Sequence, residues 1–322
     1  MDDMRRGLLG RGLARGLPAA KSQTRRHACA AKMHLIPAAL ALGDPMESGQ
    51  HMLRTGRRGT LFEFSMALRD LVTSYHRRGL AWSLAWHDVV SRYRGSILGP
   101  FWITISMGLM VLGIGLLYAK LFGISVAEFM PYVAMGIVFF GLMAGTINEG
   151  CDTFVQASSM LSQTSLPMFT FIWRTVLRNL INLAHHAVII LGVIIFFGLW
   201  RVMDVLPAVG GLLLTIVNLA WISMLAAIAS ARFRDIPQFV MSVMQFAIFM
   251  TPVFWKPDAF PDRHAFLTLN PFYHMLTTIR APLLGQEADG LSYVILAIMA
   301  VLGWALTFSV FAITRRRIVH FL

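Results

Sequence analysis

The sequence predicts an all-α, polytopic membrane protein with six transmembrane helices. Its 322 residues are 57% hydrophobic and only 14% charged, whereas soluble domains carry about 25% charged residues. Six charge-free runs each reach the ~20 residues needed to cross a hydrocarbon core of about 30 Å. Of the 28 Lys and Arg residues, 16 precede residue 95 and so flank the apolar part. This charge flanks membrane-like sequence, which argues against a nucleic-acid-binding domain, whose basic patch lies on a polar fold.

The chain begins with two segments that precede the apolar runs. Residues 1–60 are rich in Arg and small residues and poor in acids, a composition found in transit peptides. We expect either a disordered tail or a start codon assigned too far upstream, and we assign this segment no function. Residues 61–94 are predicted to form cytoplasmic amphipathic interface helices. The second carries Trp82 and Trp86 on one face and Arg94 on another, as suits a membrane–water interface.

The transmembrane domain is predicted over residues 95–322. Between its second and third spans, residues 153–165 are too polar for lipid and are predicted to form a short cytoplasmic helix, with Asp152 as a possible N-cap. Between the fifth and sixth spans, residues 261–284 are predicted to form two short re-entrant helices at the outer face, broken at Asn270-Pro271. The six predicted spans are 95–119, 129–148, 168–200, 205–231, 236–255 and 290–314.

The orientation follows from Lys and Arg residues near the ends of the spans. Placing both termini in the cytoplasm puts more of these residues on the inner side than on the outer side, as the positive-inside rule requires. The inner flanks then carry Arg92, Arg94, Arg174, Arg178, Arg232, Arg234 and Arg315 to Arg317, and the outer loops carry Lys120, Arg201, Lys256, Arg263 and Arg280.

Catalytic motifs are missing from the sequence. It contains no GxxxxGK[ST] phosphate loop, no GxSxG elbow and no HExxH pair, so we predict no catalytic residue and no ATP hydrolysis by the phosphate-loop route. The adjacent His185 and His186 diverge by about 100° on a helix, which disfavours a shared metal ion. Cys29 and Cys151 have no CxxC spacing. We therefore predict no metal site.

Polar and aromatic residues in and near the spans give the remaining candidates. Arg174 and Arg178 lie at i and i+4 near the inner end of the third span, and Glu149 lies at the inner end of the second. We predict an intramembrane ion pair between Glu149 and one of these arginines. Aromatic rings could stack on sugar rings if they face a channel, and the candidates are Trp102, Tyr118, Phe139, Phe249, Phe254, Trp255, Phe272 and Tyr273.

Five strings occur in an order that resembles a known family. They are "RDLVTSYHRRGLAWSLAWHDVVSRYRGSILGPFW", "INEGCDTF", "ARFRDIPQ", "TPVFW" and "LNPFYHMLTTIRAPLLG". Over residues 62–322 they resemble the membrane (permease) subunits of ATP-binding-cassette polysaccharide exporters. The resemblance is nearest to the lipopolysaccharide O-antigen branch, and exporters of capsule and teichoic acid share the pattern.

The resemblance implies a homodimeric permease in the bacterial inner membrane. Two separate ATPase subunits would bind ATP and Mg²⁺, so this chain would need no cofactor. The interface helix over 80–94 and the coupling helix at 153–165 would meet the ATPase, and the residues implied in this contact are Trp86, Asp88, Asp152, Phe154 and Gln156.

The substrate implied by the resemblance is a glycan linked to polyprenyl diphosphate. Arg92 and Arg94 are placed to meet the diphosphate or acidic lipid head groups, with positive-inside anchoring as the equal alternative. Two further functions stay open. One is export of another substrate, such as capsule, teichoic acid, a drug or a small lipid. The other is a membrane-embedded transferase, for which the charged residues do not cluster as expected.

Overall fold

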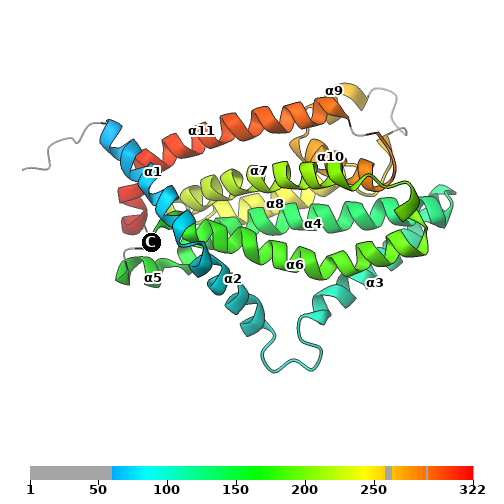
Figure 1. Cartoon of the computed structure of the whole chain (residues 1–322), viewed down its shortest axis with the longest axis horizontal. Helices are drawn as coiled ribbons and strands as arrows, with labels where there is room; N and C mark the ends of the chain where they lie inside the picture. Colours follow the sequence, from blue (N-terminus) through cyan, green and yellow to red (C-terminus); the bar gives the residue numbers. More distant parts are fainter. Residues whose placement is uncertain (1–59, 165, 258–262, 288, 322) are drawn as a thin grey trace, which may run out of the picture. The chain divides into compact units, whose positions relative to one another are not determined.

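The structure, a computed structural model, describes residues 60–164, 166–257, 263–287 and 289–321. All regular elements in these ranges are helices, which confirms the all-α fold class. They are α1 (Thr60–His76), α2 (Arg78–Arg92), α3 (Phe101–Phe122), α4 (Val126–Gln156), α5 (Ser158–Gln163), α6 (Met168–Phe196), the 3₁₀ helix η1 (Leu199–Arg201), α7 (Val205–Arg232), α8 (Ile236–Met250), α9 (Arg263–Thr268), α10 (Pro271–Leu283) and α11 (Gly290–Phe321) (Figure 1). The predicted tail 1–60 lies outside the described residues, apart from Thr60.

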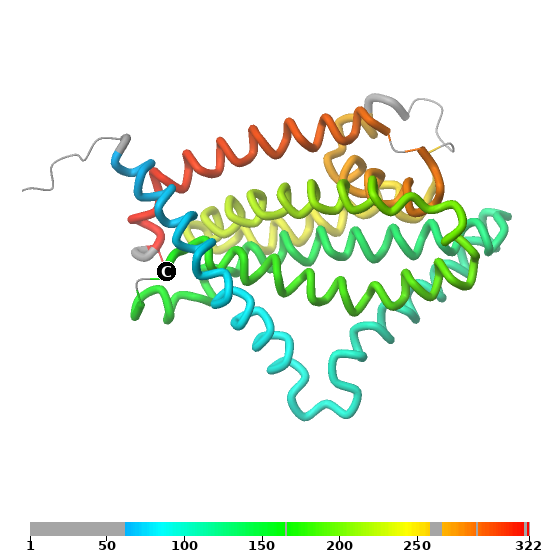
Figure 2. Tube along the Cα trace, viewed as in Figure 1, coloured from blue at the N-terminus to red at the C-terminus, as the bar shows by residue number. Residues whose placement is uncertain are grey.

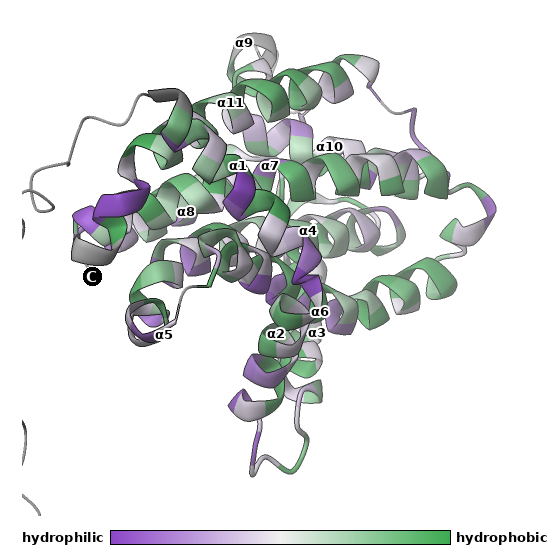
Figure 3. Cartoon of the chain, turned by 60° about the vertical axis from the view of Figure 1, so that its left-hand side comes forward, coloured by the Kyte–Doolittle hydropathy of each residue, from purple (hydrophilic) through white to green (hydrophobic). Residues whose placement is uncertain are grey.

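Five of the described helices are long and apolar enough to cross a membrane: α3, α4, α6, α7 and α11. Helices α4, α6, α7 and α11 run roughly side by side, and α3 runs obliquely to them (Figure 2). Hydrophobic residues cover most of their length, and hydrophilic residues gather near α1, α2 and the C-terminal part of α11 (Figure 3). Because apolar helices of this length are the usual way to satisfy backbone hydrogen bonds in lipid, the chain is a polytopic membrane protein.

The fifth predicted span, 236–255, is wrong at its C-terminal end. Helix α8 has only 15 residues and stops at Met250, which corresponds to a rise of about 22 Å. Thr251 is extended, as expected for a residue that precedes proline. The next residues are buried, and the Tyr132 hydroxyl donates to the Pro252 carbonyl (3.0 Å). Tertiary hydrogen bonds thus replace the last helical turn.

The first predicted span, 95–119, is also displaced. Residues 95–100 form a turn between α2 and α3, in which Gly95 and Gly99 have positive φ angles of 88° and 54°. Those angles are in the left-handed region that glycine tolerates best. Helix α3 therefore begins at Phe101 and ends at Phe122, where Gly123 supplies a left-handed C-cap.

The predicted cytoplasmic helix 153–165 is divided between two elements. Residues 153–156 are the last turn of α4, and α5 covers only Ser158–Gln163. Asp152 is therefore inside a helix, and its predicted N-cap role is wrong. Helix α4 continues this far because its end packs on α6 and α7: the Thr153 and Thr175 hydroxyls hydrogen-bond (2.9 Å). A Cβ added at Gly150 would lie 2.8 Å from Ser223.

Helix α4 forms the centre of the core. It packs against α3, α6, α7, α8 and α10, and 78% of its most apolar window is buried, against 11% for α3. Both helices are apolar, so composition does not distinguish the central helix from the peripheral one. The exposed apolar side chains of α3 require lipid or another protein chain around them.

Helices α9 and α10 lie in the range predicted for two short outer helices. Asn270 separates them: its Oδ1 accepts from the backbone N–H groups of Phe272 (2.9 Å) and Tyr273 (3.3 Å). Its Nδ2 donates to the Met250 carbonyl at the end of α8 (3.1 Å). Both helices lie at the end of the long helices opposite α1 and α5 (Figure 1). Their re-entry into the membrane stays a prediction.

Helix α1 is attached to the rest of the protein through Asp70. The Asp70 carboxylate is buried and accepts hydrogen bonds from the first backbone N–H groups of α6, at Met168 (3.3 Å) and Phe169 (3.2 Å). Arg315 of α11 lies 3.5 Å away. Asp70 thus caps a helix that begins 98 residues later in the chain, and its negative charge suits the positive end of that helix dipole.

The protonation of Asp70 depends on opposing effects. Burial raises the pKa of its carboxyl, and the Phe169 N–H, Arg315 and the Met168 N–H lower it only in part. Because the net pKa in the folded state is raised, this residue favours folding most below the usual aspartate range. That contribution is lost as the pH rises through the raised pKa.

Replacing Asp70 by alanine is expected to weaken the attachment of α1. Two buried N–H groups at the start of α6 would lose their acceptor, at a cost of about 2 kcal/mol in the free energy of unfolding. Thermal unfolding of the detergent-purified chain would measure this loss. Asp70→Asn keeps one acceptor oxygen and should lose less. Arg69→Ala, on the exposed side of the same helix, is the control, and equal unfolding of Asp70→Ala and Arg69→Ala would contradict the capping role.

Candidate functional site

The candidate site is a cluster of buried charges that joins α2 to α6. Arg174 of α6 donates twice to the Asp88 carboxylate of α2, from Nε and Nη2, both at 2.6 Å. Arg178, one helical turn further along α6, donates from Nη1 to the same carboxylate (3.1 Å). Such bidentate, charge-assisted contacts are the stronger class of protein hydrogen bonds. They fix the rotation and position of α2 against α6.

The cluster continues from α6 to α4 through Glu149. Its Oε2 accepts from Arg178 Nε (2.9 Å) and from Asn179 Nδ2 (2.6 Å). Arg92, at the end of α2, lies 3.7 Å from Oε1. Of the two arginines predicted to pair with Glu149, Arg178 does so, whereas Arg174 pairs with Asp88. We call Asp88, Glu149, Arg174 and Arg178 the charge cluster.

The charge cluster is balanced and largely shielded from solvent. It holds two carboxylates and two guanidinium groups, and the side chains of Asp88 and Arg178 are 16% and 7% exposed. Removing one partner from such a buried pair typically costs about 3–5 kcal/mol, because the remaining charge stays buried without compensation. The arrangement therefore stabilises one position of α2 and penalises its displacement from α6.

The pKa of Asp88 reflects this environment. Burial alone would raise it, but the hydrogen bonds and charges of Arg174 and Arg178 outweigh burial and hold it below the ordinary value. Because the folded-state pKa is depressed, the stabilising contribution is present above the usual aspartate range. It is lost only as the pH falls through the depressed pKa, so the Asp88 carboxylate is charged at neutral pH.

A small cavity of about 260 Å³ adjoins the charge cluster between α2, α3, α4 and α6, and is lined in part by Arg92, Glu149 and His186. Half of the Arg92 side chain is exposed, and Arg94 is exposed just beyond the end of α2. Both arginines can be reached by a ligand, and their role toward a diphosphate stays a prediction. Arg92 would have to leave Glu149 to bind one closely.

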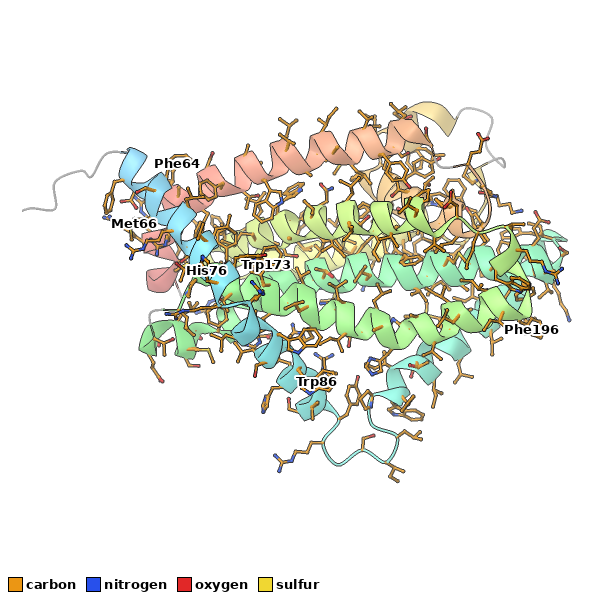
Figure 4. All side chains as sticks on the ribbon, in the orientation of Figure 1. Phe64, Met66, His76, Trp86, Trp173 and Phe196 are labelled. Carbon is orange, nitrogen blue, oxygen red and sulfur yellow. The ribbon has the colours of Figure 1, made fainter. Side chains whose placement is uncertain are left out.

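The residues predicted to contact an ATPase partner fall into two groups. Trp86 (labelled in Figure 4) is 51% exposed and stacks on Trp82 with ring centroids 6.4 Å apart, and Gln156 is exposed. Phe154 is fully buried in the core, and a direct contact through its side chain is wrong. The Asp88 carboxylate is bonded to Arg174 and Arg178 inside the subunit. Asp152 is partly buried, and its contact stays a prediction.

The predicted channel aromatics also divide. Phe139 is 5% exposed inside the central core, so its assignment to a channel surface is wrong. Phe249 is 62% exposed and Trp102 is 55% exposed. Phe254 stacks on Tyr118 and makes a tilted contact with Phe249, with ring centroids 6.2 and 6.1 Å away. Phe272 packs against Phe140, Tyr273 lines a second cavity, and Trp255 is partly buried. Channel roles for the partly or fully exposed rings stay predictions.

Sequence reasoning missed the part that Asp88 and Asn179 play in the cluster. Asp88 is 86 residues from Arg174 in the chain, and no local pattern links them. In the ranges that the structure describes, no group of three or more His, Cys, Asp or Glu residues could hold a metal ion. What the geometry does show is a direct link from α2 to α6 and α4 through Asp88, Arg178 and Glu149.

Comparisons with known proteins identify a family and a relative of this chain. The model of the ABC-2 type transporter family matches residues 79–284. The chain is also similar to the O-antigen export system permease protein RfbA of Myxococcus xanthus, with 27% identity over 212 residues, which is 64% of this chain and 81% of the relative. The matched region begins within α2 and includes the whole charge cluster.

Proposed function

Since this chain belongs to the ABC-2 type transporter family, we propose that it is the permease subunit of an ATP-driven exporter whose substrate is a glycan linked to polyprenyl diphosphate. The observation that carries the substrate class is the similarity to an O-antigen export permease over 81% of that relative. ATP would be hydrolysed by two separate partner subunits, because this sequence has no phosphate-loop motif. Two copies of this chain would enclose the path of the glycan.

The charge cluster would transmit movement from an ATPase partner to the membrane-spanning helices. A partner that presses on α2 and α5 moves α2 as a unit, because Asp88 is bonded to two arginines of α6. Arg178 and Asn179 extend the connection to Glu149 on α4, the central helix. ATP binding would therefore displace α2, α6 and α4 together, which would open or reshape the path for the glycan.

The proposed location is the bacterial inner membrane with both termini in the cytoplasm. The excess of arginine near the ends of α2, α7 and α11 supports this orientation. It places α1, α2, α5 and the charge cluster on the side where ATP is available. It also places α9 and α10 on the side where the glycan leaves.

Deletion of the gene tests the function directly. We expect surface glycan to disappear and its polyprenyl-diphosphate precursor to accumulate inside the cell, with recovery when the gene is restored together with its ATPase. Glycan blots of the cell surface and mass spectrometry of extracted lipids measure both. Normal surface glycan in the deletion strain would refute this substrate, and accumulation of a different lipid or small molecule would identify an exporter of another class.

Loss of Arg92 and Arg94 together is expected to reduce export. Each arginine can make charge-assisted hydrogen bonds to a diphosphate worth about 1.5–3 kcal/mol, so the double change to alanine should lower glycan export by about tenfold or more. The protein should still insert into the membrane. Arg69→Ala, exposed on α1, is the matched control. Unchanged export in the double variant would leave these two residues as membrane anchors only.

A further inference from the structure

A larger cavity, of about 620 Å³, lies at the opposite end of the long helices from the charge cluster. Its walls come from the start of α4, the segment after α8, helices α9 and α10, and the start of α11. We call it the outer cavity. Its volume lies within the range of small-molecule sites, and the permease role proposed above gives it no task.

The wall of the outer cavity contains a buried arginine. Arg280 is 4% exposed, its guanidinium lies 3.8 Å from the centre of the Tyr132 ring, and Nη1 donates to the Pro252 carbonyl (2.7 Å). The ion pairs found among the described residues include none to Arg280. A buried charge usually has a carboxylate partner, so this guanidinium has hydrogen-bonding capacity for a ligand.

A second polar group in the wall has no partner. The hydroxyl oxygen of Thr277, one helical turn before Arg280 on α10, is buried and makes no hydrogen bond. Buried hydroxyl groups nearly always have a hydrogen-bond partner. Two adjacent polar side chains that line the same cavity therefore have unused capacity for a bound molecule.

The mixture of groups in the wall restricts the kind of ligand. Glu128 and Lys256 form an ion pair with each other, which leaves Asp289 to repel a multiply charged anion and Arg280 to repel a cation or metal ion. The many polar side chains disfavour an apolar ligand. A neutral molecule with several hydroxyl groups, which both donate and accept, suits all of them. Tyr273 adds an aromatic ring on which the C–H face of a sugar can pack.

The wall is held in shape by a chain of hydrogen bonds. His274 of α10 bonds through Nδ1 to the Ser292 hydroxyl (2.8 Å) and through Nε2 to the Thr268 carbonyl (2.9 Å). Ser292 of α11 in turn donates to Asp289 (2.8 Å). These bonds tie α9, α10 and α11 together, and a wall fixed in this way loses less entropy when a ligand binds.

We propose that the outer cavity binds one sugar unit of the exported glycan as it leaves the permease. The proposal rests on the proposed function and adds a place of contact to it. Arg280 donates to sugar hydroxyl groups, Thr277 donates to them or accepts from them, Gln286 and Asp289 add further polar contacts, and the Tyr273 ring packs against the face of the sugar. The outer cavity would thus be a binding site for the glycan near the end of its path through the permease.

Saturation-transfer NMR on the full chain in lipid nanodiscs tests this proposal. The probes are glucose, galactose, rhamnose and N-acetylglucosamine, and we expect millimolar binding of at least one. Thr277→Val keeps the shape and removes an unpartnered hydroxyl, so it should weaken binding by about threefold to tenfold without affecting folding. Ala127→Trp places a bulky ring at an exposed position of the wall and should abolish the signal.

Ser242→Ala, at an exposed position of α8, is the control and should leave sugar binding unchanged. The proposal is overturned if folded wild-type protein binds none of the four sugars, or if Ala127→Trp binds them as well as wild type does. In cells, Ala127→Trp should reduce glycan export. If Ala127→Trp exports normally while gene deletion stops export, the outer site is refuted and the permease function stands; if deletion leaves surface glycan normal, the permease function itself fails.

Discussion

Asp88→Asn is expected to uncouple this permease from its ATPase. The substitution removes the negative charge that compensates Arg174 and Arg178 and leaves two buried guanidinium groups opposite the single carboxylate of Glu149. Removing one partner of a buried ion pair costs about 3–5 kcal/mol. We expect α2 to be held less firmly on α6, because the ion pairs of Asp88 are lost and mainly the apolar packing of Ala85 and Val89 on α6 remains.

Export and ATP hydrolysis should be measured in the same vesicles. This distinguishes a defect in coupling between ATP hydrolysis and export from a reduced amount of folded protein. In Asp88→Asn, glycan export should fall by at least about tenfold, while the partner subunits still bind and hydrolyse ATP. Asp235→Asn makes the same chemical change at an exposed site before α8 and should export normally. Full export by Asp88→Asn would show that α2 does not transmit force through the charge cluster.

A double variant tests whether Asp88 and Arg174 stabilise the protein through their interaction or independently of one another. Arg174→Met on its own leaves Asp88 with Arg178, and in combination with Asp88→Asn it removes one charge of each sign. If Asp88 and Arg174 act as a pair, the loss in the free energy of unfolding of the double variant should be smaller than the sum of the losses of the two single variants. Purely additive losses in the free energy of unfolding would mean that the two residues act separately.

Some glycines in the spans pack against the backbone of another segment. Among these, we expect replacement of Gly211 by alanine to reduce the free energy of unfolding most. A Cβ at residue 211 would lie 2.4 Å from the carbonyl oxygen of Thr278 and 2.7 Å from its carbonyl carbon. These are backbone atoms of α10, which cannot rotate away as a side chain could. Relief of the overlap requires α7 and α10 to separate, and forcing extra volume into a packed interior typically costs about 1–3 kcal/mol.

The matched control for this substitution is Gly113→Ala in α3, where an added Cβ would meet no atom within 4 Å. Alanine favours helix over glycine by about 1 kcal/mol, so this variant should be as stable as wild type or more so. Thermal unfolding and monodispersity of the purified chains in detergent compare the two. Equal midpoints for both variants would contradict the close packing of α7 on α10. Because Thr278 is adjacent to Thr277, Gly211→Ala should also impair sugar binding in the outer cavity.

Some features of the fold could be read from local sequence. The membrane class followed from long charge-free runs, and one helix boundary followed from residues that act locally, because α10 begins at Asn270-Pro271 as predicted. The end of α8 was misplaced because Thr251–Val253 are as apolar as a membrane span. In the structure they form a buried turn, and the Pro252 carbonyl accepts hydrogen bonds from Tyr132 and Arg280.

Assignments that depend on the surroundings of a side chain could not be read in the same way. Phe139 and Phe249 are both aromatic residues in apolar runs, yet one is 5% exposed and the other 62% exposed. Phe154 follows the polar residue Asp152 and still lies fully in the core. Hydropathy is equal for a side chain that faces lipid and for one that faces another helix, so it cannot rank these positions.

The sequence by itself determined that this chain is helical, crosses a membrane and lacks a phosphate-loop ATP site. Those properties depend on local composition, because the free energy of transfer into lipid is determined by the residues of a run and by its length. Only the tertiary structure decided that α4 is central, that Asp88 holds Arg174, and that Arg280 lies against Tyr132. These properties depend on contacts between residues far apart in the chain, such as Asp88 and Arg178, which are separated by 90 positions, and packing alone brings such residues together.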